Sequence, residues 1–492
     1  MSADQDSKGA PSLRRLRQRA LSLGGAHAFD YITHFLLPVV LARCLDTVSF
    51  GQYRLLWLAA RTAMALAPLA MPASLYFFLP RSDPSTKRMY INQTLVFLSL
   101  TGLISGWAVS RWNPWLPNSM HALDEHGAIV PLFVLLWVMA SLLDMLPAIE
   151  ERVRWQTKAI IGLAALRTVA LAVTAYVARE IGPLLMVLVA FVLIKIALLI
   201  AYLARNHGLR GPVLRWRAFV DQIRHATPFG AAGALYDLRG QADQWVAAAI
   251  FSLHSFASFS VASVIGMLVS LCRKSVNTAF LPGMSKLQAK GDLRGMLDLN
   301  SRANVMVGAL VCPLAAFAFV FAEEVITIIY TASYLDAAPV MRLYVLALVP
   351  LVVELASITL LLRRGPFVVA LNAVAILLAV PISWFAAQHF GLAGAAAGSV
   401  SMIYLDRIVT LHYISRLSGI PVRRLQDWSM LGRQVLCAAL AAAFAGWVTH
   451  HYLPASPPWI RLMFGGTLLG AAYFAMLGMR NVRSGFAIAG KP

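Results

Sequence analysis

The chain has 492 residues, of which 59% are hydrophobic and 13% charged, and its formal net charge is +20. Soluble globular proteins carry about 25% charged residues, so this composition excludes a soluble globular protein. The basic residues fall mainly between hydrophobic stretches, which indicates membrane topology and excludes a nucleic-acid-binding protein. The four cysteines have neither metal-site nor disulfide spacing, and we predict no metal and no cofactor.

Apolar stretches of about 20 residues, the length that crosses a bilayer, recur along the chain. They predict an all-α polytopic membrane protein with about fourteen transmembrane helices. In chain order the expected spans are 22–42, 55–80, 91–111, 127–148, 158–178, 181–203, 226–251, 255–280, 303–323, 337–362, 366–388, 391–413, 433–452 and 458–479.

Lysine and arginine are distributed unevenly over the connecting segments. Alternate segments are rich in them, as in 1–21, 204–225 and 414–432, whereas the segments between hold few. Basic residues mark the cytoplasmic side of a membrane protein. We therefore predict a bacterial inner-membrane protein with both termini in the cytoplasm.

The expected spans group into two lobes of six helices. We predict a basic cytoplasmic N-terminal segment, an N-lobe, a cytoplasmic linker, a C-lobe and a C-terminal helix pair with its tail. Their residues are 1–21, 22–203, 204–225, 226–413 and 414–492. Asp30 followed by "FGQY" is echoed by Asp237 followed by "FASF", which indicates a parallel repeat typical of transporters.

The stretch "LYDLRGQADQW" at 235–245 places several polar residues inside the seventh expected span. A charge near the bilayer centre costs about 2.5–3.5 kcal/mol, so such residues must face protein, water or one another. Arg239 and Asp243 are four residues apart and could pair on one helix. The pair would leave a second polar face unexplained, which favours a hydrated cavity beside this span.

Further charged residues lie deep in other expected spans. The predicted cavity residues are Arg61, Arg167, Arg239, Arg273 and Lys274, and the candidates for ion coupling are Asp30, Asp243 and Glu354. Asp406 and Arg407 adjoin the last turns of the twelfth span, where charged side chains can reach the interface, and stay outside this set. Arginine binds phosphate oxygens bidentately, so the surplus of arginine predicts an anionic cargo.

The stretch "LPVVLARCLDTVSFGQY" at 37–53 resembles the first hairpin of Wzx-type polysaccharide flippases. The resemblance continues through "FLPGMSKLQAKGD" at 280–292 and "FAEEVITIIYTASYLDAAPVMRLYVLAL" at 321–348 to "FGLAGAAAGSVSMIYLDRIV" at 390–409. It covers nearly the whole chain and places it in the exporter superfamily (MOP) that includes MATE antiporters and lipid II flippases.

This resemblance implies two six-helix lobes around a central cavity that work by alternating access. It implies that undecaprenyl-pyrophosphate-linked oligosaccharide moves from the cytoplasmic to the periplasmic leaflet for exopolysaccharide, O-antigen or capsule synthesis. Basic residues on the second and eighth spans of such flippases correspond to Arg61 and to Arg273 or Lys274, and an acidic one to Asp243. H+ or Na+ could couple transport. The implied partners are membrane lipids and a polymerase or co-polymerase complex.

Two other interpretations stay open. A MATE-like small-molecule antiporter should have an acidic, cation-receptive cavity, which the intramembrane arginines do not favour. A membrane polysaccharide polymerase or ligase needs a large periplasmic loop with catalytic arginine and histidine. The longest expected periplasmic loop, 112–126, offers only His121 and His126 as candidate catalytic residues and has no arginine. We therefore expect a transporter and not an enzyme.

Overall fold

The computed structural model describes residues 13–114, 116, 118–208 and 211–478, without the side chains of 13–21, 118, 264–272, 274 and 275. The described residues form α-helices and short 3-10 helices, and none of them is in a strand. Two compact units divide the chain, unit 1 at Met1–Ala234 and unit 2 at Leu235–Pro492. The division falls inside helix α9 (Trp216–Arg239). The boundaries of the two six-helix lobes stay predictions.

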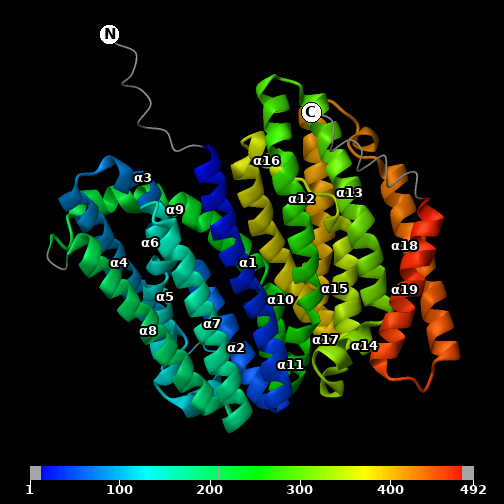
Figure 1. Ribbon diagram of the computed structural model, residues 1–492, viewed down its shortest axis with the longest axis horizontal. Helices are drawn as coiled ribbons and strands as arrows, with labels where there is room; N and C mark the ends of the chain where they lie inside the picture. The colour runs from blue at the N-terminus through cyan, green and yellow to red at the C-terminus, as the bar shows by residue number, and fades with distance from the viewer. Residues whose placement is uncertain (1–12, 115, 117, 209–210, 479–492) are drawn as a thin grey trace. The chain divides into compact units, whose positions relative to one another are not determined.

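Unit 1 contains the helices before α9 and most of α9 itself (Figure 1). These are α1 (Leu13–Cys44), α2 (Thr47–Leu66), α3 (Met71–Phe78), η1 (Leu79–Arg81), α4 (Pro84–Ala108), η2 (Asn118–His126), α5 (Ile129–Ala140), α6 (Leu142–Ile149), α7 (Val153–Ala178) and α8 (Ile181–His207). Helix α1 packs against α7, and α4 packs against α5.

Unit 2 begins with the last turn of α9. It continues with α10 (Ala242–Ile250), α11 (Leu253–Ala262), α12 (Val264–Ala289), α13 (Leu293–Val320), α14 (Ala322–Ile329), η3 (Ala332–Tyr334), α15 (Ala337–Leu351), α16 (Ala356–Leu361), α17 (Gly365–Ser418), η4 (Val422–Arg424), α18 (Trp428–Tyr452) and α19 (Pro458–Leu477). Helices α18 and α19 lie side by side, and α18 also packs on α13 (Figure 1).

Each of the fourteen expected spans overlaps one or more of these helices. Within the described residues, eight segments are long and apolar enough to cross a membrane. They are Thr47–Arg81, Ile129–Ile149, Val153–Ala178, Ile181–His207, Leu293–Val320, Gly365–Ser418, Trp428–Tyr452 and Pro458–Leu477. The all-helical polytopic architecture is therefore confirmed, and spans beyond these eight stay predictions.

The longest described helix, α17, contains two of the expected spans. Its backbone is non-helical at Gly391, where φ is +64° and ψ is −148°, a combination that residues with a side chain rarely adopt. Helix α17 is thus two helices joined at Gly391. They pack closely, because a Cβ on Gly398 would lie 2.1 Å from the carbonyl oxygen of Ala379.

Several expected spans are broken into two helices. Helix α2 gives way to α3 across Pro68, Leu69 and Ala70, where φ is +41° at Leu69 and +58° at Ala70. Helix α15 ends at Leu351, directly after Pro350, and α16 begins at Ala356. Proline removes a backbone donor and ends or bends a helix. Both breaks therefore lie beside a proline, Pro68 in the first and Pro350 in the second.

Candidate functional site

Arg239 ends helix α9 and is held by helix α17. Its Nη1 donates to Oδ1 of Asn372 at 2.9 Å, and its Nη2 donates to the carbonyl oxygen of Met402 at 3.2 Å. Nη2 also pairs with Oδ2 of Asp406 at 3.1 Å, and both charged side chains are mostly buried. A buried guanidinium therefore has one full carboxylate partner and two neutral oxygen partners.

The alternative in which Arg239 and Asp243 pair with each other on one helix does not hold. Helix α9 ends at Arg239 and α10 begins at Ala242, so the two residues belong to different helices. Glycine disfavours a helix interior, and Gly240 lies in the break. Asp243 instead accepts hydrogen bonds from the Tyr344 hydroxyl at 2.6 Å and from the amide of Gln244 at 2.8 Å.

Arg407 is a second buried arginine on helix α17. Its side chain is 14% exposed, and its Nη1 lies 3.9 Å from Oδ2 of Asp406, too far for a hydrogen bond. Its Nε is buried with no hydrogen-bond partner among the described residues. Since buried N–H groups are nearly always paired, this donor has unused capacity for a ligand.

Arg273 and Glu354 complete the charged group around Arg407. Arg407 interacts electrostatically with both of them, as well as with Asp406 and Arg239. Arg273 lies on α12, and its Nη1 is 3.4 Å from the carbonyl oxygen of Leu351, near the end of α15. Glu354 lies in the break between α15 and α16.

The backbone of Glu354 is held by two asparagines of α13. Its N–H donates to Oδ1 of Asn304 at 3.1 Å, and its carbonyl oxygen accepts from Nδ2 of Asn300 at 3.0 Å. Oε1 accepts from the amide of Ser357 at 3.1 Å, whereas Oε2 is buried without a partner among the described residues. The break in the helix therefore presents a carboxylate with one unused oxygen.

We call this group the unit 2 cluster, and it consists of Arg239, Arg273, Glu354, Asp406 and Arg407. As far as the described side chains go, it holds three guanidinium groups and two carboxylates. Buried charges are normally paired, so one positive charge in excess favours an anionic ligand. Lys274, which the sequence predicts here, has a side chain outside the described residues.

Unit 1 arranges its buried arginine differently. Arg167 on α7 is almost fully buried, and its Nη2 pairs with Oδ1 of Asp30 on α1 at 3.2 Å. The guanidinium also lies 2.9 Å and 3.0 Å from the two ring nitrogens of His34 and 3.4 Å from Oγ1 of Thr33. One carboxylate thus compensates the charge of Arg167.

A second buried cation in the expected spans of unit 1 is also paired. Nζ of Lys195 on α8 lies 2.8 Å from Oδ2 of Asp144 on α6 and 5.0 Å from the centre of the Trp137 ring. Arg61 on α2 is exposed and has no ion-pair partner among the described residues. Of the predicted cavity residues in unit 1, only Arg61 is therefore free to bind an anion.

The structure brings together some of the predicted residues and separates others. Asp30 joins Arg167, and Glu354 joins Arg239 and Arg273 through Arg407. Sequence reasoning missed the partners that lie far away in the chain, Asn372 and Tyr344, and it left out Asp406 and Arg407. Asp406 and Arg407 were placed near the end of a span, but in the structure α17 continues to Ser418. Both residues therefore lie well inside the helix.

Comparison with known proteins places this chain in a family and a fold. A family model described as "Polysaccharide biosynthesis protein" matches residues 40–339. "Uncharacterized membrane protein EpsK" of Bacillus subtilis (strain 168) is 31% identical over 179 residues, which are 34% of this chain and 34% of EpsK. The aligned region therefore spans only about a third of that relative.

Two solved structures share the fold. The lipid II flippase MurJ, in an inward closed conformation, has a TM-score of 0.66 at 10% identity, over 92% of this chain and 98% of MurJ. An inward-facing MATE family transporter of the MOP superfamily has a TM-score of 0.61 at 12% identity, over 80% of this chain and 95% of that chain. The fold is thus that of MOP superfamily transporters, as the resemblance predicts.

Proposed function

The chain belongs to the polysaccharide biosynthesis protein family, and on this premise we propose that it is a flippase for lipid-linked oligosaccharide. In this proposal it moves undecaprenyl-pyrophosphate-linked repeat units from the cytoplasmic to the periplasmic leaflet of a bacterial inner membrane. It spans the membrane fourteen times with both termini in the cytoplasm. Transport proceeds by alternating access through a cationic central cavity, and the protein is a transporter rather than an enzyme.

The observation that carries this proposal is the surplus of positive charge in the unit 2 cluster. A diphosphate offers several anionic oxygens, and arginine forks bind such oxygens bidentately. Arg407 has a buried N–H without a partner among the described residues, and Arg239 shares a single carboxylate with it. A diphosphate would neutralise the excess charge and fill the unused donor.

The other predicted residues take supporting roles in this proposal. Arg61 on α2 is the candidate cargo ligand of unit 1, because it has no ionic partner among the described residues. Arg167 would have to leave Asp30 before it could bind the cargo, so its contribution depends on the state of that carboxylate. H+ or Na+ uptake by Asp30, Asp243 or Glu354 would couple transport, and Glu354 has a free carboxylate oxygen for an ion.

The broken helices would supply the movement. Alternating access needs one part of the molecule to move against another around a bound cargo. The breaks beside Pro68 and Pro350 interrupt the backbone hydrogen bonds of two expected spans. The left-handed residues Leu69 and Ala70 make the first break a costly conformation that a change of state would relieve. We assign the helix pair α18–α19 to contacts with membrane lipids or with a polymerase complex.

Reconstituted transport tests the proposal. Purified protein in liposomes should move a lipid-linked oligosaccharide to the opposite leaflet, and the double variant Arg61→Ala, Arg273→Ala should lose most of this activity. Arg302→Ala is the matched control, because Arg302 is an exposed arginine of α13 that pairs with Asp298 on the same helix. Unchanged transport in the double variant would overturn the basic-cavity proposal.

A second candidate function follows from the MATE likeness. The shared fold is compatible with a small-molecule antiporter, which would take up organic cations. The unit 2 cluster disfavours cationic cargo, since its excess charge has the same sign. Uptake of cationic dyes by the liposomes, lost in Asp243→Asn and retained in Arg407→Gln, would support the antiporter and contradict the flippase.

A further inference from the structure

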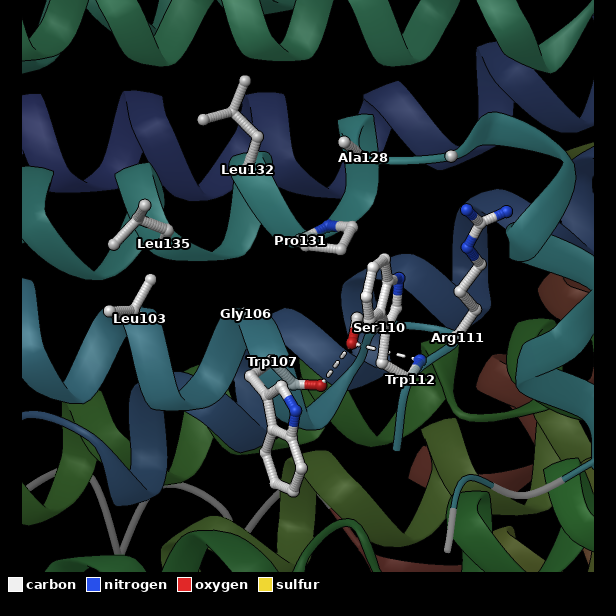
Figure 2. A pocket seen from close by; sticks show the side chains of 11 residues that line it. Leu103, Gly106, Trp107, Ser110, Arg111, Trp112, Ala128, Pro131, Leu132 and Leu135 are labelled. Atoms are coloured by element: carbon white, nitrogen blue, oxygen red, sulfur yellow. Dashed lines mark hydrogen bonds between the residues drawn. The ribbon is translucent and has the colours of Figure 1, made fainter. Parts of the chain in front are cut away.

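A pocket of about 450 Å³ opens in unit 1 between the end of α4 and the start of α5 (Figure 2). This volume lies within the range of about 300–1,000 Å³ that is typical of small-molecule sites. The pocket lies far in sequence from the unit 2 cluster and uses none of its residues. We call it the Arg111 pocket.

One end of the Arg111 pocket is apolar. Leu103 of α4 and Pro131, Leu132 and Leu135 of α5 line it (Figure 2). The two helices meet closely beneath it, because a Cβ on Gly106 would lie 2.8 Å from the carbonyl oxygen of Pro131. The absence of a side chain at Gly106 lets the two helices approach this closely, and the side chains that line this end are suited to a hydrocarbon chain.

The other end carries polar and aromatic groups. Oγ of Ser110 donates to the carbonyl oxygen of Trp107 at 2.7 Å, which holds the end of the helix in place. Cζ of Arg111 lies 5.7 Å from the ring centre of Trp112. Arg111 is exposed and has no acidic partner among the described residues. The mouth of the pocket thus holds an uncompensated positive charge beside two exposed indole rings.

The expected span 91–111 places the Arg111 pocket at the border between hydrocarbon and water. On α4 the apolar side chains of Leu100, Leu103 and Ile104 are 56–63% exposed, as expected of a face turned to lipid. Trp107 and Trp112 follow at 50% and 69% exposure, and tryptophan concentrates at membrane interfaces. Arg111 comes at the end of the expected span, where a lipid headgroup would lie.

We propose that the Arg111 pocket binds an anionic glycerophospholipid. One acyl chain lies along Leu103, Leu132 and Leu135, and the phosphate meets the guanidinium of Arg111. The indole N–H groups of Trp107 and Trp112 lie at the level of the glycerol and its esters. A free sugar fits this pocket poorly, because the apolar side chains that line one end offer no hydrogen bonds to its hydroxyl groups. A zwitterionic headgroup would bring a second cation toward Arg111.

Native mass spectrometry of the full-length protein in detergent tests this proposal. Dioleoyl phosphatidylglycerol and dioleoyl phosphatidylcholine are titrated in parallel onto the wild type and onto Arg111→Gln. We expect one tight phosphatidylglycerol site in the wild type that weakens about tenfold in Arg111→Gln, as loss of a charge-assisted hydrogen bond predicts. Phosphatidylcholine binding should be weaker in the wild type and should not change.

Two further variants keep the test decisive. Arg179→Gln is the matched control, because Arg179 is an exposed arginine that follows α7 in another expected periplasmic loop. It should keep the wild-type affinity. Leu132→Trp fills the apolar end and should abolish the tight site. Phosphatidylglycerol affinity that is unchanged in Arg111→Gln, or equal for both lipids in the wild type, would overturn the proposal. Transport activity does not enter this test, so it stands apart from the flippase proposal.

Discussion

Units 1 and 2 both bury arginine within the expected membrane spans, but they compensate it differently. In unit 1, Arg167 has Asp30, and the buried Lys195 has Asp144. In the unit 2 cluster, three arginines share Asp406 and Glu354 within the described side chains. Pairing satisfies a buried charge at the cost of making it unavailable to a ligand. The uncompensated arginines of unit 2 are therefore better candidates for cargo binding than Arg167.

The largest expected effect comes from removing the acid of the unit 2 cluster. Asp406→Asn leaves Arg239 and Arg407 without their nearest carboxylate, and breaking a buried ion pair typically costs about 3–5 kcal/mol. We expect a clear drop in the thermal unfolding temperature of the detergent-solubilised protein. Asp298→Asn should change it little, because the Asp298–Arg302 pair is exposed. Equal stability of the two variants would contradict the tight coupling of Asp406 to the arginines.

Arg407→Gln should lower transport activity without changing stability, whereas Arg167→Gln should lower stability. Arg407→Gln removes the surplus charge, so unfolding should be unchanged while flippase activity falls about 10- to 100-fold, the value of one or two charge-assisted hydrogen bonds. Arg167→Gln removes the ion-pair partner of Asp30 and should lower the free energy of unfolding by about 2 kcal/mol. This is less than the loss of a fully buried pair would cost, because Asp30 is 33% exposed. Parallel unfolding and liposome assays measure both. Similar destabilisation by both variants would show that Arg407 stabilises the fold, and would contradict its role in binding the cargo.

Tyr344→Phe tests how unit 2 stabilises a carboxylate that has no arginine partner. The variant removes the hydroxyl that donates to Asp243 and leaves a buried acceptor less satisfied, at a cost of about 2 kcal/mol. Thermal unfolding measures the loss. Tyr404→Phe removes a hydroxyl that donates to the carbonyl of Leu346 at the surface and should cost less than half as much. A larger loss in the control would show that Asp243 does not depend on Tyr344.

The smallest effect concerns Glu150, at the end of α6 in unit 1. Burial alone would raise the pKa of Glu150, but the ion-pair contact with His207, the hydrogen bond from Tyr202 and the charge of Arg152 outweigh it and lower the pKa. This stabilisation is complete above the unfolded pKa of about 4.3 and is lost as the pH falls through the folded value.

Glu150→Gln should therefore destabilise by about 1 kcal/mol at pH 7, because glutamine keeps one acceptor oxygen. The difference from the wild type should shrink as the pH falls below the unfolded pKa of about 4.3, and it should vanish below the folded pKa, where glutamate is protonated in both states. Thermal unfolding at several pH values measures it. A gap that stays constant down to pH 3.5 would show that the charge of Glu150 contributes nothing.

The sequence predicts most of the architecture, because the physics of a bilayer is local. Each span must be apolar over about 20 residues, and this requirement is visible in any window of the chain. Even the breaks at Pro68 and Pro350 follow from the chemistry of single residues. The fourteen expected spans outnumber the eight long apolar segments of the described residues, partly because Gly365–Ser418 contains two expected spans and because breaks divide others, such as 337–362, into shorter helices.

Pairing inside the membrane was decided by tertiary structure. Arg239 and Asp243 are only four residues apart in the sequence, but the break at Gly240 separates them, and Arg239 pairs with Asp406, 167 residues away. Which arginine is paired depends on which helices pack together, and no local pattern contains that information. The sequence by itself determined that charges had to lie within the membrane and face protein or water. Only the fold decided that Asp30 satisfies Arg167, whereas Arg407 keeps a donor unused.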